Sequence, residues 1–110
     1  MIAKINKLSR KDFLVCSKST NLLFSPILSL KYKINNLEFG RWSVVVSKKL
    51  SKKAVERNKI KRRVYEVLAR HLLFYKIDGI IYPKPAVLNL DYEKLSFEID
   101  SLVSKIPIFS

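Results

Sequence analysis

The chain has 110 residues, a formal net charge of +13 and one cysteine, Cys16. This length predicts one domain, residues 1–110, with a modest core, and a lone cysteine excludes an internal disulfide, so we expect a cytoplasmic protein. No apolar run approaches the roughly 20 residues of a membrane helix. The charge predicts a polyanionic partner, nucleic acid in preference to an anionic membrane, and no protein partner is indicated.

Positive charge is concentrated in one part of the sequence. Residues 1–76 contain 19 of the 22 Lys and Arg residues but only four of the nine Asp and Glu residues. Nine basic residues and one acid, Glu56, lie within residues 48–63. Exposed surfaces usually mix the two signs because like charges repel, so this segment indicates a binding surface for a polyanion.

A short helix is predicted over residues 10–17. Ser9 stands at the N-cap position, and Asp12 follows it at the spacing of a capping box. Leu8 and Phe13 occupy the two positions of a hydrophobic staple. The chain is therefore expected to open with a capped helix.

Two strands are predicted next, over residues 25–34 and 41–47, with residues 35–40 as the loop between them. In the first, apolar and polar residues alternate, which predicts one buried face and one wet, basic face; the second is rich in Val, with Trp42, Val44 and Val46 on one side. We expect the two strands to pair as an antiparallel hairpin. The residues assigned to the buried faces are Leu28, Leu30, Tyr32, Ile34, Trp42, Val44 and Val46.

A longer helix is predicted from an N-cap at Ser51 to about residue 74. Its buried stripe consists of apolar residues at helical spacing, namely Ile60, Val64, Val67 and Leu68. The polar arc around it holds Asn58, Lys59, Lys61, Arg62 and Tyr65. The pair Asp78 and Gly79 is expected to end this element.

The C-terminal part predicts a short buried strand over residues 80–82, stopped by Pro83 and Pro85. Asp91 can cap a last helix whose apolar residues are Tyr92, Leu95, Ile99, Leu102 and Val103. The order α-β-β-α-β-α, with one short edge strand left unlocated, predicts an α+β fold: a single two-layer domain in which a small, mostly antiparallel sheet packs with helices.

The start of the long helix carries Lys52 and Lys53. Positive charge there opposes the helix dipole at a cost of about 0.3–1 kcal/mol each, whereas a phosphate would be bound by the free N–H groups and the lysines together. The alternative is that exposed lysines are simply tolerated. In the following turns Asn58 can read a base or sugar edge, while Arg and Lys suit phosphates; the alternative there is a solvated basic helix face.

The stretch over residues 46–66 resembles the signature of the bacterial ribonuclease P protein family. That signature has a Lys-Lys pair after a strand, then Ala, then Arg-Asn-Arg-x-x-Lys-Arg on the following helix. The matching positions here are Lys48 and Lys49, Ala54, Arg57, Asn58 and Lys59, and Lys61 and Arg62. The order of elements supports the resemblance over nearly the whole chain.

Four positions depart from the family pattern. Lys59 stands where Arg is usual, which keeps the charge but loses bidentate contact. Ser51 occupies a frequent Gly position, Ser17 stands where many members carry a second aromatic residue, and Pro83 replaces a basic residue. The last three bear on the substrate cleft.

The resemblance implies a subunit of a ribonucleoprotein endoribonuclease whose catalytic centre lies in its RNA. That enzyme removes the 5′ leader of precursor tRNA with Mg²⁺ bound chiefly by the RNA subunit and the substrate. The fold implied is ribosomal protein S5 domain 2-like, with the order α-β-β-(β)-α-β-α and a left-handed β-α-β crossover, where the general rule predicts a right-handed one.

The resemblance also implies two binding surfaces and no catalytic or metal-ligating residue in this chain. The surface for the catalytic RNA would comprise Lys48, Lys49, Lys52, Lys53, Arg57, Asn58, Lys59, Lys61 and Arg62. The single-stranded leader would lie between the first helix and the sheet, at Phe13, Tyr32, Lys31 and Lys33. For Phe13 the staple, and for Tyr32 a place in the core, remain open alternatives.

Three other functions stay open from the residues alone. A ribosomal or other structural RNA-binding protein has the same composition. A DNA-binding module would use the basic helix in a major groove, though no two-helix unit is evident. An independent nuclease would need a metal site, and the spacing of the acids near the basic surface, Asp12, Glu38, Glu56 and Glu66, suggests none. His71, the one histidine, is interpreted as a structural or surface residue and not as a catalyst.

Overall fold

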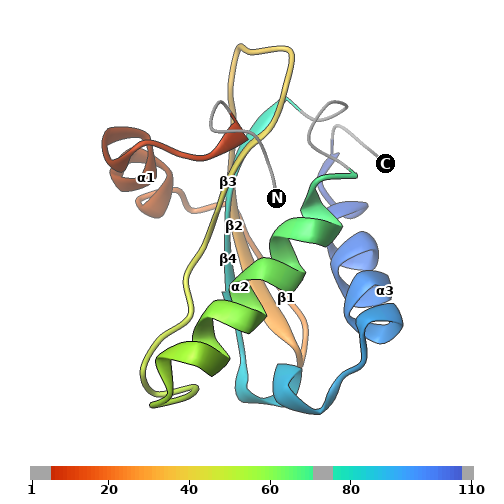
Figure 1. Ribbon diagram of the computed structural model, residues 1–110. Helices are drawn as coiled ribbons and strands as arrows, with labels where there is room; N and C mark the ends of the chain where they lie inside the picture. Colours follow the sequence, from red (N-terminus) through yellow and green to blue (C-terminus); the bar gives the residue numbers. More distant parts are fainter. Residues whose placement is uncertain (1–5, 71–75, 108–110) are drawn as a thin grey trace.

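The computed structural model describes residues 6–70 and 76–107, arranged as one sheet with helices on both of its faces (Figure 1). The elements in chain order are α1 (Arg10–Ser17), β1 (Leu22–Phe24), β2 (Leu28–Ile34), β3 (Arg41–Val44), α2 (Ala54–Leu68), β4 (Ile77–Pro83), the 3₁₀ helix η2 (Pro85–Asn89) and α3 (Tyr92–Val103). No helix in the described part of the chain is long and apolar enough to span a membrane.

The sheet has four strands in the order β1-β2-β4-β3. β2 pairs antiparallel with β1 and β4, while β3 pairs parallel with β4. Because β3 and β4 are parallel neighbours, α2 forms the β-α-β crossover between them. The predicted α+β class and mostly antiparallel sheet are confirmed, and β1 is the edge strand that the sequence pattern did not locate.

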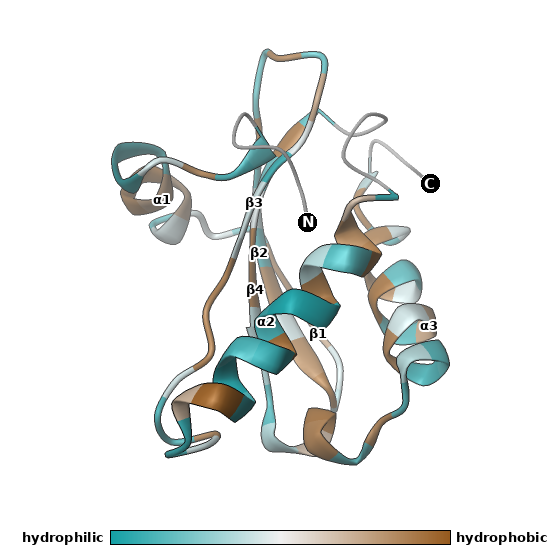
Figure 2. Cartoon of the chain, viewed as in Figure 1, coloured by the Kyte–Doolittle hydropathy of each residue, from teal (hydrophilic) through white to brown (hydrophobic). Residues whose placement is uncertain are grey.

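The core lies between the sheet and the pair α2 and α3. α1 packs alone on the opposite face of the sheet (Figure 1). Brown, apolar residues turn from the helices toward the sheet, and the outer side of α2 is mostly hydrophilic (Figure 2). The predicted stripe on α2 is confirmed, as are the buried residues of the last helix apart from Tyr92; the core includes Leu28, Leu30, Trp42, Val44, Ile60, Val64, Val67, Leu68, Leu95, Ile99 and Leu102.

The first and last helices begin at the side-chain caps that the sequence predicts. α1 has the predicted bounds, and the Ser9 side chain accepts a hydrogen bond from the Asp12 N–H. Asp91 caps α3 in the same way through the Lys94 N–H. In α2 the N-cap is Lys53 and not Ser51, whose hydroxyl accepts the Lys53 N–H two residues before the helix. The predicted N-cap was therefore wrong by two residues.

The predicted hairpin of β2 and β3 was wrong. Both strands pair with β4, which lies between them. Residues 77–81 are all buried, and a strand buried on both faces belongs at the centre of a sheet. The loop over residues 35–40 therefore crosses the end of β4, where the Asn35 N–H donates to the Lys76 carbonyl at 3.0 Å.

Other boundaries also differ from the prediction. β2 begins at Leu28, because the Ser25 hydroxyl accepts from the N–H groups of residues 27 and 28 in a tight turn. Ile34 is 54% exposed at the end of β2. α2 ends at Leu68, and the rest of the predicted helix to residue 74, with His71, lies outside the described residues.

Gly79 does not end the long helix but lies within β4, where it has a packing role. The sheet register places it between Tyr32 of β2 and Trp42 of β3. The fully buried Trp42 ring lies against it, so that a Cβ at Gly79 would be 2.3 Å from Trp42 Cζ3. Only glycine leaves room for this ring at the centre of the sheet.

We predict that Gly79→Ala destabilises the fold by about 1–3 kcal/mol or more, because overpacking forces the rigid indole ring or the strand to move. Urea unfolding measures the change. Adding Trp42→Phe to Gly79→Ala should recover part of the loss, since the smaller ring relieves the clash and the two changes then couple. Strictly additive free energies would contradict this packing.

Candidate nucleic-acid interface

The loop between β3 and α2 presents its lysines on a fixed backbone. Leu50 is 9% exposed and joins the core, and the Arg57 guanidinium donates to the Ser51 carbonyl at 2.9 Å. The loop is therefore anchored twice, once through the Leu50 side chain and once through the Ser51 carbonyl. The four lysines around them are exposed: Lys48, Lys49, Lys52 and Lys53.

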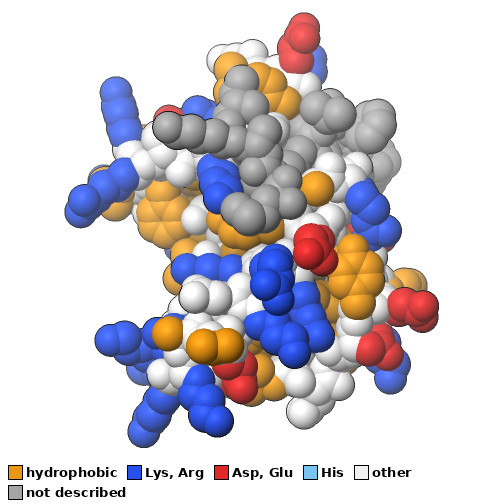
Figure 3. All heavy atoms as spheres, in the orientation of Figure 1, with side chains coloured by type: hydrophobic (Ala, Val, Ile, Leu, Met, Phe, Trp, Pro, Cys, Tyr) orange, Lys and Arg blue, Asp and Glu red, His pale blue; other side chains and the backbone are white. Residues whose placement is uncertain are grey.

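The first turn of α2 has no side-chain cap, because Lys53 occupies the N-cap position. Its free N–H groups and the neighbouring lysines therefore face the same solvent region. Figure 3 shows Lys and Arg side chains gathered over α2 and over the loop at its start. This arrangement suits phosphate oxygens, which accept from main-chain N–H groups and from ammonium groups alike.

The predicted polar arc of α2 divides into two sides. Asn58, Lys61 and Arg62 line a shallow pocket of about 290 Å³ together with Tyr65 and Lys7. The Lys7 ammonium lies 5.5 Å from the centre of the Tyr65 ring, and the Tyr65 hydroxyl accepts the Val44 N–H at 3.2 Å. Sequence reasoning missed Lys7, because nothing in the pattern links residue 7 to the middle of α2.

Lys59 lies on the other side of the helix. It lines a separate groove between α2 and η2, with Lys53, Arg63 and Leu88 among its neighbours. The structure therefore does not bring Lys59 together with Asn58 and Arg62, although the three are close in sequence.

The face of the sheet opposite the core forms the second candidate surface. β2 directs Ser29, Lys31 and Lys33 to this face, and α1 covers only the end of it near Asp78, whose carbonyl accepts the Cys16 thiol hydrogen at 3.4 Å. Burial raises the pKa of the Cys16 thiol to about 11. In Figure 3 the outline is hollowed on the left, between α1 above and the loop before α2 below.

Of the four residues predicted for a leader strand, Tyr32 is excluded. Its side chain is 8% exposed and belongs to the core on the α2 side, so its ring is not available to a base. Lys33 is exposed, whereas the Lys31 ammonium donates to the Ser17 carbonyl at 2.8 Å and so joins the sheet to the end of α1. Phe13 is half-buried on α1.

Two aromatic residues on this face were missed. Tyr82 of β4 lies opposite Ser29, and Ser29 in turn lies opposite Phe24 of the edge strand β1. Phe24 is 63% exposed, with the Lys84 ammonium 5.7 Å from its ring centre. Because their position depends on strand register, only the pairing of β1, β2 and β4 reveals them.

α1 is held on the sheet by a network of charges around Arg41. The Arg41 guanidinium donates from Nε and Nη2 to the two carboxylate oxygens of the buried Asp78, at 2.9 and 2.8 Å, and from Nη1 to Asp12 of α1 at 2.8 Å. The Asn35 side-chain amide donates a third hydrogen bond to the Asp78 carboxylate at 2.8 Å. A hydrogen bond from Ser9, and then the charge of Arg41, lower the pKa of Asp12 below its ordinary value of 3.8.

The acids of the described residues do not form a metal site. No group of three or more His, Cys, Asp and Glu side chains among residues 6–70 and 76–107 is placed to hold a metal ion.

Comparison with known proteins places this fold in a family. Residues 3–107 match the family model for ribonuclease P. The chain belongs to the family of ribonuclease P protein components. It is 34% identical to the ribonuclease P protein component of Rickettsia canadensis, over 92% of this chain and 86% of that protein, and 32% identical to that of Thermotoga petrophila, over 84% and 74%.

Solved structures agree with the sequence relatives. The ribonuclease P protein of Thermotoga maritima superposes with a TM-score of 0.81 at 25% identity, covering 91% of this chain and 96% of that one. Membership of the family makes the chain a protein subunit of ribonuclease P, gives it a part in tRNA processing, and implies association with the RNA of that enzyme.

We predict that Asp12→Asn lowers the urea midpoint of unfolding at pH 7. A carboxylate whose pKa is lowered in the fold stabilises it above its unfolded-state pKa, and this contribution is lost as the pH falls below 3.8 through the lowered pKa. The difference between Asp12→Asn and the native chain should therefore shrink toward pH 3. Glu38→Gln, in the exposed loop before β3, is the control, and a difference that stays constant with pH would contradict the role of Asp12.

Proposed function

We propose that this chain binds the catalytic RNA of ribonuclease P through the loop and α2, and holds the 5′ leader of precursor tRNA on the open face of the sheet. The observation that carries the proposal is the presentation of residues 48–63. Leu50 and Arg57 anchor the backbone of the loop from which the exposed lysines extend. A preorganised loop backbone loses less entropy when the loop binds an RNA backbone.

The pocket that Asn58, Lys61 and Arg62 share with Lys7 is the centre of the first surface. Two ammonium groups, one guanidinium group and one amide in a small space suit a phosphate with an adjacent sugar or base edge. Each phosphate neutralised adds to the salt dependence, so contact with six to ten phosphates would weaken binding about 10³–10⁵-fold between 50 and 200 mM salt.

The open face of the sheet is the second surface. A single strand needs cations along its backbone and flat or apolar side chains under its bases. Lys33 supplies exposed charge, Phe24 and Tyr82 supply rings on the same face, and Phe13 lies on the bordering helix. The loop between β3 and α2 borders this face at its other end (Figure 1), so the leader would run from one RNA-binding surface toward the other.

In this proposal the RNA carries out the endonucleolytic cleavage, and the protein positions the catalytic RNA and the 5′ leader of the precursor tRNA. Mg²⁺, which activates water and stabilises the leaving oxygen in such hydrolysis, would be bound chiefly by the RNA and the substrate. No residue of this chain is assigned to the metal.

Reconstitution tests the function directly. The purified chain, mixed with the ribonuclease P RNA of its own genome and a precursor tRNA at low magnesium, should stimulate removal of the 5′ leader. Equal cleavage rates with and without the chain would reject the proposal, and cleavage by the chain without RNA would point to an independent nuclease.

Single substitutions separate the two surfaces. We predict that Arg62→Ala weakens binding of the ribonuclease P RNA about tenfold and lowers the salt slope by about one, while leaving the preference for precursor over mature tRNA intact. Phe13→Ala and Tyr82→Ala should reduce that preference and leave RNA affinity unchanged. Affinities for the RNA, for precursor tRNA and for mature tRNA check both effects, and equal losses in all three would reject the two-surface arrangement.

A further inference from the structure

The groove that contains Lys59 lies on the other side of α2 from the pocket formed by Asn58, Lys61 and Arg62. It runs between the first turns of α2 and the η2 segment and has a volume of about 430 Å³, within the range of small-ligand sites. The residues that line it include Val55, Glu56, Lys59, Arg63, Val87 and Leu88.

Two apolar side chains flank this groove from elements far apart in the sequence. Val55 of α2 is 82% exposed and Leu88 of η2 is 44% exposed, above the buried Ile60 and Val87. Val55 follows the first residue of a helix whose outer side is otherwise mostly hydrophilic (Figure 2). Exposed apolar groups that face one another across a groove can take a flat apolar ligand between them.

The charges at the groove favour an anion as part of that ligand. Lys53, Lys59 and Arg63 line it together with a single acid, Glu56. Lys53 belongs both to this groove and to the four loop lysines, so the positive charge of the groove is continuous with that of the candidate RNA surface. A nucleotide unites the two properties, because its base has apolar faces and its phosphate is an anion.

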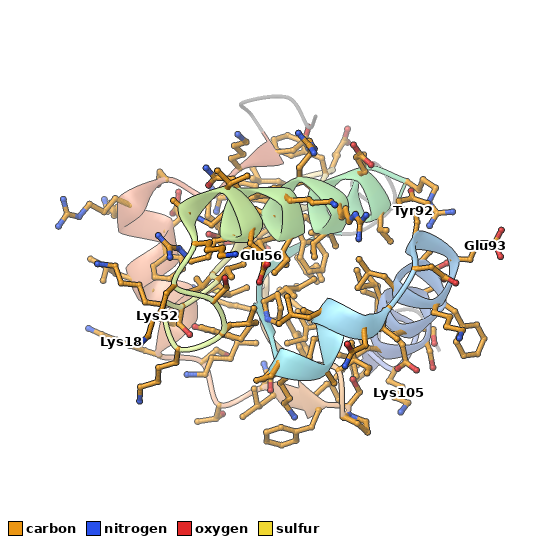
Figure 4. The ribbon with its side chains drawn as sticks, turned by 60° about the horizontal axis from the view of Figure 1, so that its bottom comes forward. Lys18, Lys52, Glu56, Tyr92, Glu93 and Lys105 are labelled. Atoms are coloured by element: carbon orange, nitrogen blue, oxygen red, sulfur yellow. The ribbon has the colours of Figure 1, made fainter. Side chains whose placement is uncertain are left out.

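The Glu56 carboxylate would set the orientation of a ligand in this groove. It points from α2 into the space between α2 and η2 (Figure 4). The ion pairs among the described residues join Arg41 to Asp12 and Asp78, and Arg70 to Asp100, so that the Glu56 carboxylate stays available to a ligand. A carboxylate repels a phosphate but accepts hydrogen bonds from the amino group of a base, which directs the base inward and the phosphate toward Lys59 and Arg63.

We infer that this groove binds one unstacked nucleotide of the partner RNA, with the base between Val55 and Leu88 and the phosphate at Lys59 and Arg63. The inference rests on the proposed RNA-binding function and adds to it an apolar subsite on the far side of α2. A base that offers an amino group to Glu56 is the preferred occupant.

The test compares the native chain with the double variant Val55→Ala and Leu88→Ala, using the ribonuclease P RNA of the same genome as the probe. Both side chains are exposed, so the variant should keep its thermal midpoint. Phe97→Ala, which removes a 70% exposed ring on α3, is the matched control. Binding is measured over a salt series, and the bases of the RNA are probed with dimethyl sulfate and a carbodiimide.

We expect the double variant to bind about five- to tenfold more weakly with an unchanged salt slope, because it removes an apolar contact and no cation. One unpaired base should be protected by the native chain and by Phe97→Ala, and become reactive with the double variant. Unchanged affinity and protection, or an equal loss with Phe97→Ala, would overturn the groove assignment. A protein partner would then be the alternative occupant of the groove. Failure of the native chain to bind the RNA would reject the proposed function and this inference together.

Discussion

The ion network of Arg41 is the constraint on which both candidate surfaces depend. Asp78 is buried in the central strand, and a buried carboxylate without a partner costs several kcal/mol. The parallel register places Arg41 of β3 directly beside it, and Nη1 of the same guanidinium donates to Asp12 of α1. One buried charge thus ties the centre of the sheet to its edge strand and to the helix on its open face.

This network also explains why the sheet keeps an open face at all. α1 is fixed over the end of the sheet near Asp78, and the Lys31 ammonium secures its last residue, Ser17. The parallel crossover requires the chain to leave β3 at the opposite end before it enters α2. The basic loop therefore forms the other border of the same face (Figure 1). Both candidate surfaces therefore result from one arrangement of strands.

Sequence reasoning succeeded where the cause was local. Ser9 and Asp91 act on N–H groups three residues away, and the apolar stripe of α2 repeats within one helix, so periodicity and caps predicted them. It failed where the cause was distant in sequence. Gly79 was interpreted as the end of a helix, because the Trp42 ring that requires a glycine there belongs to another strand. Tyr32 was offered as a platform through the family resemblance, whereas the alternation within its own strand had already assigned it to the buried face, where the structure has it.

The candidate site was likewise predictable from local sequence only in part. For Lys59, the sequence did not show on which side of α2 the side chain lies. Composition identified the basic segment, but the helix separates its cations by direction. Arg57 turns back to the loop, where its Nη1 donates one hydrogen bond to the Ser51 carbonyl. Lys59 faces a groove with apolar flanks, where a single point charge can meet one phosphate. Lysine in place of the usual arginine is therefore compatible with the role of that side of α2, because bidentate geometry matters less there than charge.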